Sequence, residues 1–149
     1  MGLVYAEITL INAVDMGMAK RNLIGEEEIR EVKIEMMVDS GAYEMAINES
    51  LQEQLVLTFI EKRKAILADG RINEYDVVGP ILVKFANRTA ICSAMVLPGN
   101  LGLLLGAIPM EEMDVRIHPR RQELIVDQKH PEGPQLSMRK SRKAVAKTL

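Results

Sequence analysis

The sequence predicts an all-β domain with a closed or strongly bent sheet and one or two short helices. Three observations lead to this fold class. Apolar and polar residues alternate with a period of two along most of the chain, which is typical of half-buried strands. Turn-forming pairs such as Asp69-Gly70 and Asn87-Arg88 separate the extended runs. The segments with helical signals are few and short, so strands must supply most of the core.

The first part of the chain is predicted to hold two strands and a short helix. The alternation runs over residues 4–10 and again over residues 32–38, and a polar connection bracketed by Gly17 and Gly25 joins the two. Asn48 is expected to cap a helix over roughly residues 49–56, because its side-chain oxygen can accept a hydrogen bond from a free backbone amide of the first turn.

The middle of the chain is predicted to form a long β-hairpin. Residues 57–67 and 72–85 are its two arms, and Asp69-Gly70 is a strong signal for a tight two-residue turn between them. Beyond this hairpin, further strands are expected over residues 90–96, 103–105, 115–117 and 124–126, with a short helix beginning near Pro109, a residue type that suits the first turn.

The content of cysteine and histidine limits the kinds of disulfide and metal site that the chain can form. The 149 residues contain one cysteine, Cys92, and two histidines, His118 and His130. A single cysteine excludes an intrachain disulfide framework and a cysteine-based zinc site. With only two histidines besides, we do not expect a histidine-rich metal centre either. Cys92 alternates with apolar neighbours, so we interpret it as a core thiol. One unpaired cysteine also fits a reducing compartment, and we expect a cytoplasmic protein.

Charge is divided unevenly along the chain. Residues 135–149 hold five basic side chains and no acid, whereas the rest of the chain is acidic. We therefore predict a domain over residues 1–130 and a basic tail outside the fold over residues 131–149. The acidic body makes nucleic acid an unexpected partner. An adaptor that binds nucleic acid through the basic stretch 139–147 is kept as a weaker hypothesis; its five basic residues are Arg139, Lys140, Arg142, Lys143 and Lys147.

No membrane association is expected. Residues 89–110 form the longest uncharged stretch, which is long enough to cross a bilayer. However, Pro98-Gly99-Asn100 interrupts it, and Gly102 and Gly106 follow closely, so the stretch is better interpreted as strands joined by a turn. The N-terminus lacks a basic segment, and Glu7 interrupts its apolar run, so no targeting signal is predicted.

The sharpest local signal is the run Met37-Val38-Asp39-Ser40-Gly41-Ala42, in which a carboxylate follows a strand directly. Ser40 offers a hydroxyl to that carboxylate, and Gly41, having no Cβ, lets a backbone amide or a ligand come close to it. Taken alone, the triplet is better explained as a polar turn at a strand end, with Asp39 paired locally, because such triplets often arise by chance.

In its wider context the sequence resembles the retropepsin-like aspartic proteases of clan AA. Two apolar residues before Asp-Ser-Gly-Ala match the first hallmark of this family, and Leu104-Leu105-Gly106 before a short helix matches the second. Between them the family places a flap hairpin, which corresponds here to Ala68, Asp69, Gly70 and Arg71. The resemblance covers roughly residues 3–127.

The resemblance implies a closed, mostly β acid-protease barrel that forms a homodimer and cleaves peptides without a cofactor. Asp39 would be the catalytic acid/base, paired with the same residue of a second copy. Ser40 would brace the pair across the twofold axis, while Gly41 and Ala42 would lie where the substrate backbone passes. The flaps would exclude water and bind an extended peptide or protein substrate as an added strand.

Two positions depart from the family pattern. Ala107 follows the second glycine, where many retroviral members have a charged residue that braces the dimer, and Tyr43 is bulky where many relatives have a small or acidic one. The alternative hypothesis is therefore a non-catalytic dimeric module that binds peptides on the same fold, in which Asp39 is structural.

Overall fold

The structure, a computed structural model, describes residues 2–67, 69–100 and 102–138. It confirms the mostly β fold class. The strands form a seven-stranded sheet with the order β1-β2-β7-β3-β6-β5-β4 and a separate two-stranded sheet, β8-β9. Their bounds are β1 Val4–Asn12, β2 Glu31–Val38, β3 Met45–Asn48, β4 Thr58–Ile66, β5 Ile72–Phe85, β6 Arg88–Leu97, β7 Leu104–Leu105, β8 Val115–His118 and β9 Glu123–Val126.

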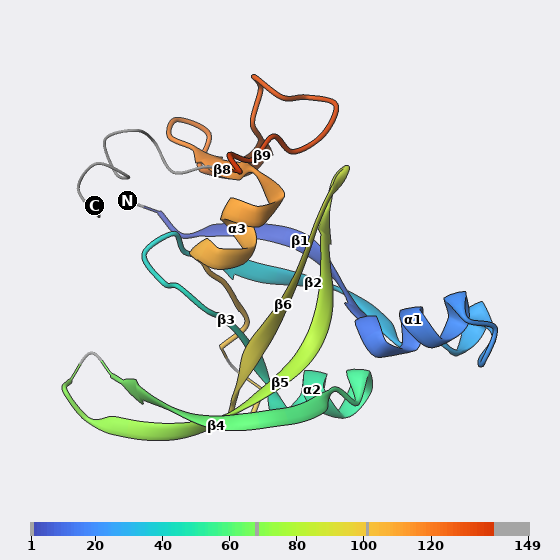
Figure 1. The fold of residues 1–149 in the computed structure, drawn as a ribbon. Coiled ribbons are helices and arrows are strands. Elements are labelled where there is room, and N and C mark those ends of the chain that lie inside the picture. The colour runs from blue at the N-terminus through green and yellow to red at the C-terminus, as the bar shows by residue number, and fades with distance from the viewer. Residues whose placement is uncertain (1, 68, 101, 139–149) are drawn as a thin grey trace, which may run out of the picture.

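The large sheet curls back on itself. Besides its antiparallel pairing with β2, β1 also pairs with β5, so the pairings pass around a ring of six strands. β4 is attached to β5 outside this ring, and the two strands form the long hairpin that extends from the body (Figure 1). We describe the sheet as a ring of strands rather than as the closed barrel that was expected.

The core fills the inside of this ring. Ile8 and Leu10 of β1 are fully buried, as are Ile81 and Val83 of β5. Leu10 lies opposite Val83 in the register, which is how the β1–β5 pairing joins the two ends of the ring. Alternation of buried and exposed positions along β1 follows from the period of two in its sequence.

Two of the helices lie where the sequence predicts them. α2 covers Glu49–Leu55, and the Asn48 Oδ1 accepts a hydrogen bond from Leu51 N at 2.8 Å, as expected of an N-cap. α3 covers Ala107–Met113 and buries Met110 and Met113 against the core. Only Gly106 separates the end of β7 from the start of this helix.

The connection between β1 and β2 was predicted as a polar connection with no helix, and the structure corrects this. It contains helix α1, Ala13–Lys20, and a 3₁₀ turn, η1, Glu26–Glu28. Asn12 starts α1, because its Oδ1 accepts hydrogen bonds from the backbone amides of Val14 and Asp15. Asp15 is buried and accepts from Arg30 N at 3.0 Å, which fixes the helix against the start of β2.

The chain beyond β9 contacts the β5–β6 turn. The Asn87 Nδ2 donates to the carbonyl oxygens of Pro131 and Glu132, and the buried Arg88 donates to the His130 carbonyl oxygen. The basic stretch of the tail, residues 139–147, lies outside the described residues. None of the helices in the described part of the chain is long and apolar enough to span a membrane.

Candidate active site

Asp39 immediately follows β2, at the point where β7 is inserted beside it. β7 runs parallel to β2, with Val38 opposite Leu105, and antiparallel to β3, with Ala46 opposite Leu104. The Asp39 backbone amide donates to the Leu105 carbonyl oxygen at 3.0 Å. The two apolar hallmarks of the sequence are therefore neighbours in space, and they hold the backbone of Asp39 in place.

The loop after Asp39 presents its carboxylate to solvent. The Gly41 amide donates to the Asp39 Oδ1 at 2.9 Å, and the Ala42 amide donates to the Asp39 carbonyl oxygen at 3.2 Å. A Cβ on Gly41 would lie 3.2 Å from the same Oδ1, which is a tight contact. Asp39, Ser40 and Gly41 are all exposed. The turn orients one carboxylate oxygen and leaves the carboxyl group open to a reactant or a second protein.

Gly106 allows the second hallmark to cross this loop at close range. A Cβ at Gly106 would overlap the Glu44 carbonyl oxygen and lie 2.8 Å from that of Ala42. The next two amides, those of Ala107 and Ile108, donate to the carbonyl oxygens of Ala42 and Tyr43 at 2.6 and 3.0 Å. The segment after β7 therefore fastens the loop that carries Asp39.

Asp39 is among the residues that line a largely apolar pocket of about 530 Å³. The lining also includes Leu3 near the N-terminus, Met37 of β2, and Ile117 and Pro119 of the β8–β9 hairpin. Leu3 is 68% exposed, so this side of the pocket is uncovered in a single chain. Leu3, Ile117 and Pro119 were not predicted as neighbours of Asp39, because they lie far from it in the sequence.

The predicted flap is the hairpin of β4 and β5. Its tip is tight: the Leu67 amide donates to the Arg71 carbonyl oxygen, and the Gly70 amide donates to that of Leu67. Gly70 adopts a φ of 85°, which favours glycine. Asp69 accepts hydrogen bonds from the backbone amide and Nε of Arg71. Ala68, the remaining flap residue predicted, lies outside the described residues.

The hairpin and the Asp39 loop are joined by an ion pair that the sequence did not suggest. Arg63 of β4 places its Nη1 3.1 Å from the Glu44 Oε1 and its Nη2 2.6 Å from the Glu61 Oε1. The hydrogen bond to Glu61, together with the Glu44 carboxylate, raises the pKa of the Arg63 guanidinium. The flap-tip residues themselves do not line the Asp39 pocket. Arg63 contacts the Asp39 loop through Glu44.

Asp114, Asp127 and His130 form a cluster with candidate ligand atoms within 4.8 Å of one another. The cluster is already engaged internally, since the His130 Nδ1 lies 2.8 Å from the Asp114 Oδ2 and the Gln135 amide also donates to that oxygen. The hydrogen bond with His130 lowers the pKa of the Asp114 carboxyl group. These residues are not part of the pocket that contains Asp39.

Comparison with known proteins gives three findings. A family model described as aspartyl protease matches residues 26–108, more than half of the chain and a span that includes Asp39 and Gly106. No curated protein matches in sequence. Among 75 matching solved chains is the retroviral protease-like domain of Ddi1 from Leishmania major. It is 17% identical with a TM-score of 0.53, and the match covers 86% of this chain and 90% of that one. At this identity the likeness concerns the fold.

Proposed function

Because the chain belongs to the aspartyl protease family, we propose that it is a homodimeric endopeptidase in which Asp39 and its counterpart from a second copy form the catalytic pair. The observation that carries the proposal is the exposed Asp39 carboxylate at the end of β2. The Gly41 amide fixes one of its oxygens, and the strand beneath it is held by β7.

A second copy supplies what a single chain lacks. The sequence contains the Asp-Ser-Gly triplet once, and peptide hydrolysis by this chemistry needs two carboxyl groups. The apolar side of the Asp39 pocket, with the exposed Leu3, is the kind of surface that a partner covers. A twofold axis close to Asp39 brings the two carboxyl groups together and buries this surface in the same step.

The reaction follows from the charge state of such a pair. Two adjacent carboxyl groups cannot both ionise without a large electrostatic cost, so together they retain one proton. The ionised group removes a proton from a water molecule as the water oxygen attacks the scissile carbonyl carbon. The protonated group donates to the carbonyl oxygen. When the C–N bond of the resulting tetrahedral intermediate breaks, the amine leaves with a proton from the pair.

The remaining predicted residues have supporting roles. Ser40 adjoins Asp39 and is exposed, so its hydroxyl is available to the partner's loop across the axis. Gly41 and Ala42 leave space for the backbone of an extended peptide. The β4–β5 hairpin acts as the flap, which covers the bound peptide and excludes bulk water during the reaction.

The test is cleavage of a peptide mixture at mildly acidic pH, with products identified by mass spectrometry. We expect the wild-type protein to cleave internal peptide bonds and Asp39→Asn to lose at least about a thousandfold in kcat/KM, because the amide cannot serve as the base. Asp127→Asn is the matched control and retains activity, since Asp127 is not part of the Asp39 pocket.

The same assay, together with a peptide-binding measurement, distinguishes the endopeptidase from the alternative, a non-catalytic peptide-binding module. If wild type and Asp39→Asn bind peptides equally and neither cleaves them, the catalytic claim is wrong and the module hypothesis holds. A titration of the Asp39 carboxyl group gives an independent readout. A working pair shows two well-separated apparent pKa values, whereas a structural acid shows one.

A further inference from the structure

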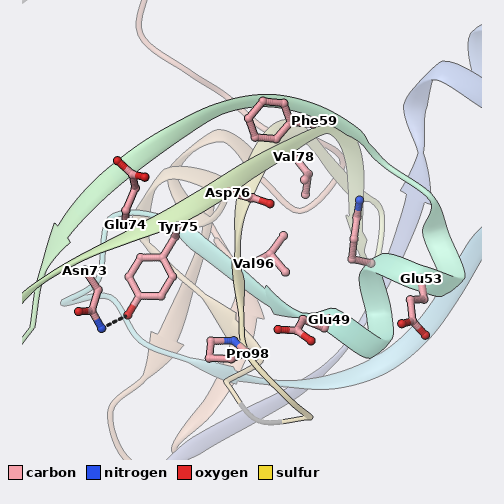
Figure 2. Close-up of a pocket in the computed structure, with 11 residues that line it drawn as sticks. Glu49, Glu53, Phe59, Asn73, Glu74, Tyr75, Asp76, Val78, Val96 and Pro98 are labelled. Atoms are coloured by element: carbon pink, nitrogen blue, oxygen red, sulfur yellow. Dashed lines mark hydrogen bonds between the residues drawn. The ribbon is translucent and has the colours of Figure 1, made fainter.

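A second pocket lies at the base of the β4–β5 hairpin, separate from Asp39. It has a volume of about 700 Å³, and its walls come from α2, both arms of the hairpin and the end of β6 (Figure 2). The residues that line it do not include Asp39 or its loop. A cavity of this volume falls within the usual range for ligand sites.

The pocket is strongly acidic. Four carboxylates line it, Glu49 and Glu53 from α2 and Glu74 and Asp76 from β5, and no lysine or arginine is found among the described lining residues. Asp76 is paired with Lys62 at the surface, with 3.1 Å between Nζ and Oδ1. The side chains of the other three make no hydrogen bond or ion pair with any residue that the structure describes. Their negative charge is therefore available to a ligand.

One part of the pocket wall is apolar. Phe59 of β4 and Val78 of β5 are cross-strand partners, and Figure 2 shows them on the opposite side of Val96 from Glu49. Phe59 is 55% exposed, so its ring is open to a ligand. A long side chain with a cationic end matches both features, because its methylene groups can pack on the apolar wall while its charge lies among the carboxylates.

We propose that this pocket binds a lysine- or arginine-bearing segment of a partner polypeptide. Binding of a basic peptide is favoured because the carboxylates and the apolar wall select against acidic and purely polar ligands. It is independent of catalysis at Asp39. Since Phe59 and Asp76 belong to the two arms of the flap, the bound segment contacts the same hairpin that covers the proposed active site.

The test measures the fluorescence anisotropy of a short labelled peptide with alternating lysines, alongside a counterpart with glutamines. We expect the full-length protein to bind the lysine peptide saturably and the glutamine peptide far more weakly. Glu49→Gln combined with Glu74→Gln should weaken binding about tenfold, because it removes two unpaired charges from opposite walls. Glu26→Gln combined with Glu27→Gln makes the same change in net charge at η1 and should leave the affinity unchanged.

Phe59→Ala tests the apolar wall without changing the charge, and we expect it to weaken the lysine peptide several-fold. Equal weakening by the Glu49/Glu74 double variant and the Glu26/Glu27 double variant would show general attraction to an acidic surface and overturn the proposal. So would an unchanged affinity of Phe59→Ala.

A full-length variant with Arg139, Lys140 and Arg142 changed to glutamine should bind as wild type does. Tighter binding would mean that the chain's own tail occupies the pocket, which would also overturn it. Circular dichroism confirms that each variant is folded.

Discussion

Gly106 is the residue at which the proposed active site tolerates substitution least. Any Cβ there meets the main-chain oxygens of Ala42 and Glu44, which cannot move without displacing the Asp39 loop. We expect Gly106→Ala to lower the free energy of unfolding by roughly 2–3 kcal/mol, as measured by urea denaturation. Gly17→Ala is the control, because its Cβ would meet nothing within 4 Å inside α1 and should add about 0.5–1 kcal/mol. A Gly106→Ala protein as stable as wild type would contradict this packing.

Cys92 is half-buried against the core, and we expect its thiol to react slowly. Burial raises its pKa to about 12, and the carboxylates of Glu112 and Glu44 add to the shift. The reactive thiolate is therefore scarce at neutral pH in the folded protein. We expect a disulfide reagent to modify the native protein at pH 8 at least about tenfold more slowly than the urea-unfolded protein. Similar rates in both states would show that Cys92 is not protected by the core.

The Asp114 carboxyl group makes the stability of the fold depend on pH in the acidic range. Its folded-state pKa is depressed by the hydrogen bond from His130, with a further contribution from the Gln135 amide. A depressed carboxyl pKa contributes stability above the ordinary value of about 3.9, and this contribution is lost as the pH falls through the lower folded-state value. We expect the Tm of wild type to fall more steeply below about pH 4 than that of Asp114→Asn. Parallel Tm profiles would show that this contact does not contribute.

At the scale of elements, the connection between the flap and the Asp39 loop depends on Arg63. Both members of the Arg63–Glu44 pair are partly exposed, with side-chain exposures of 42% and 34%, so the pair contributes little to global stability. We expect Arg63→Gln to change the free energy of unfolding by less than about 1 kcal/mol. Amide hydrogen exchange in residues 58–66 and 72–76 should nevertheless become faster, because the hairpin loses its tether. Unchanged exchange in the hairpin would refute this role.

Sequence patterns predicted those elements whose signals are local. The alternation in β2 and the Asn48 cap each depend on neighbouring residues, and the structure confirms them. The hairpin around Asp69-Gly70 is present as predicted, but Leu67 faces Arg71 across its tip, so the turn is longer than the two residues expected. Helix α1 was missed because Gly17 and Gly25 were taken as the ends of a loop, whereas the Asn12 cap and the buried Asp15 stabilise a helix.

β3 was missed for a related reason. Met45–Asn48 is buried at every position, so it shows no alternation, and its partners β6 and β7 are distant in sequence. The features of the candidate active site fall into the same two groups, local and long-range. The Asp39 triplet and Leu104-Leu105-Gly106 are readable as motifs, whereas the Arg63–Glu44 pair and the neighbours of Asp39 from both chain ends depend on topology.

At the scale of the whole molecule, the proposed mechanism requires two copies of the chain to share one active site. A single chain presents one exposed Asp39 beside an uncovered apolar surface that includes Leu3. Covering that surface and completing the carboxyl pair are the same event in the proposed dimer. Activity should therefore fall on dilution, as the dimer dissociates, when it is measured per mole of chain.

The most direct test is the peptidase activity of mixtures of wild type and Asp39→Asn at constant total protein concentration, after exchange of subunits. If each active site takes Asp39 from both copies, activity follows the square of the wild-type fraction, and an equal mixture has about one quarter of the wild-type activity. Activity that falls only in proportion to the wild-type fraction, to about one half in the equal mixture, would show that each chain acts alone and would contradict the shared site.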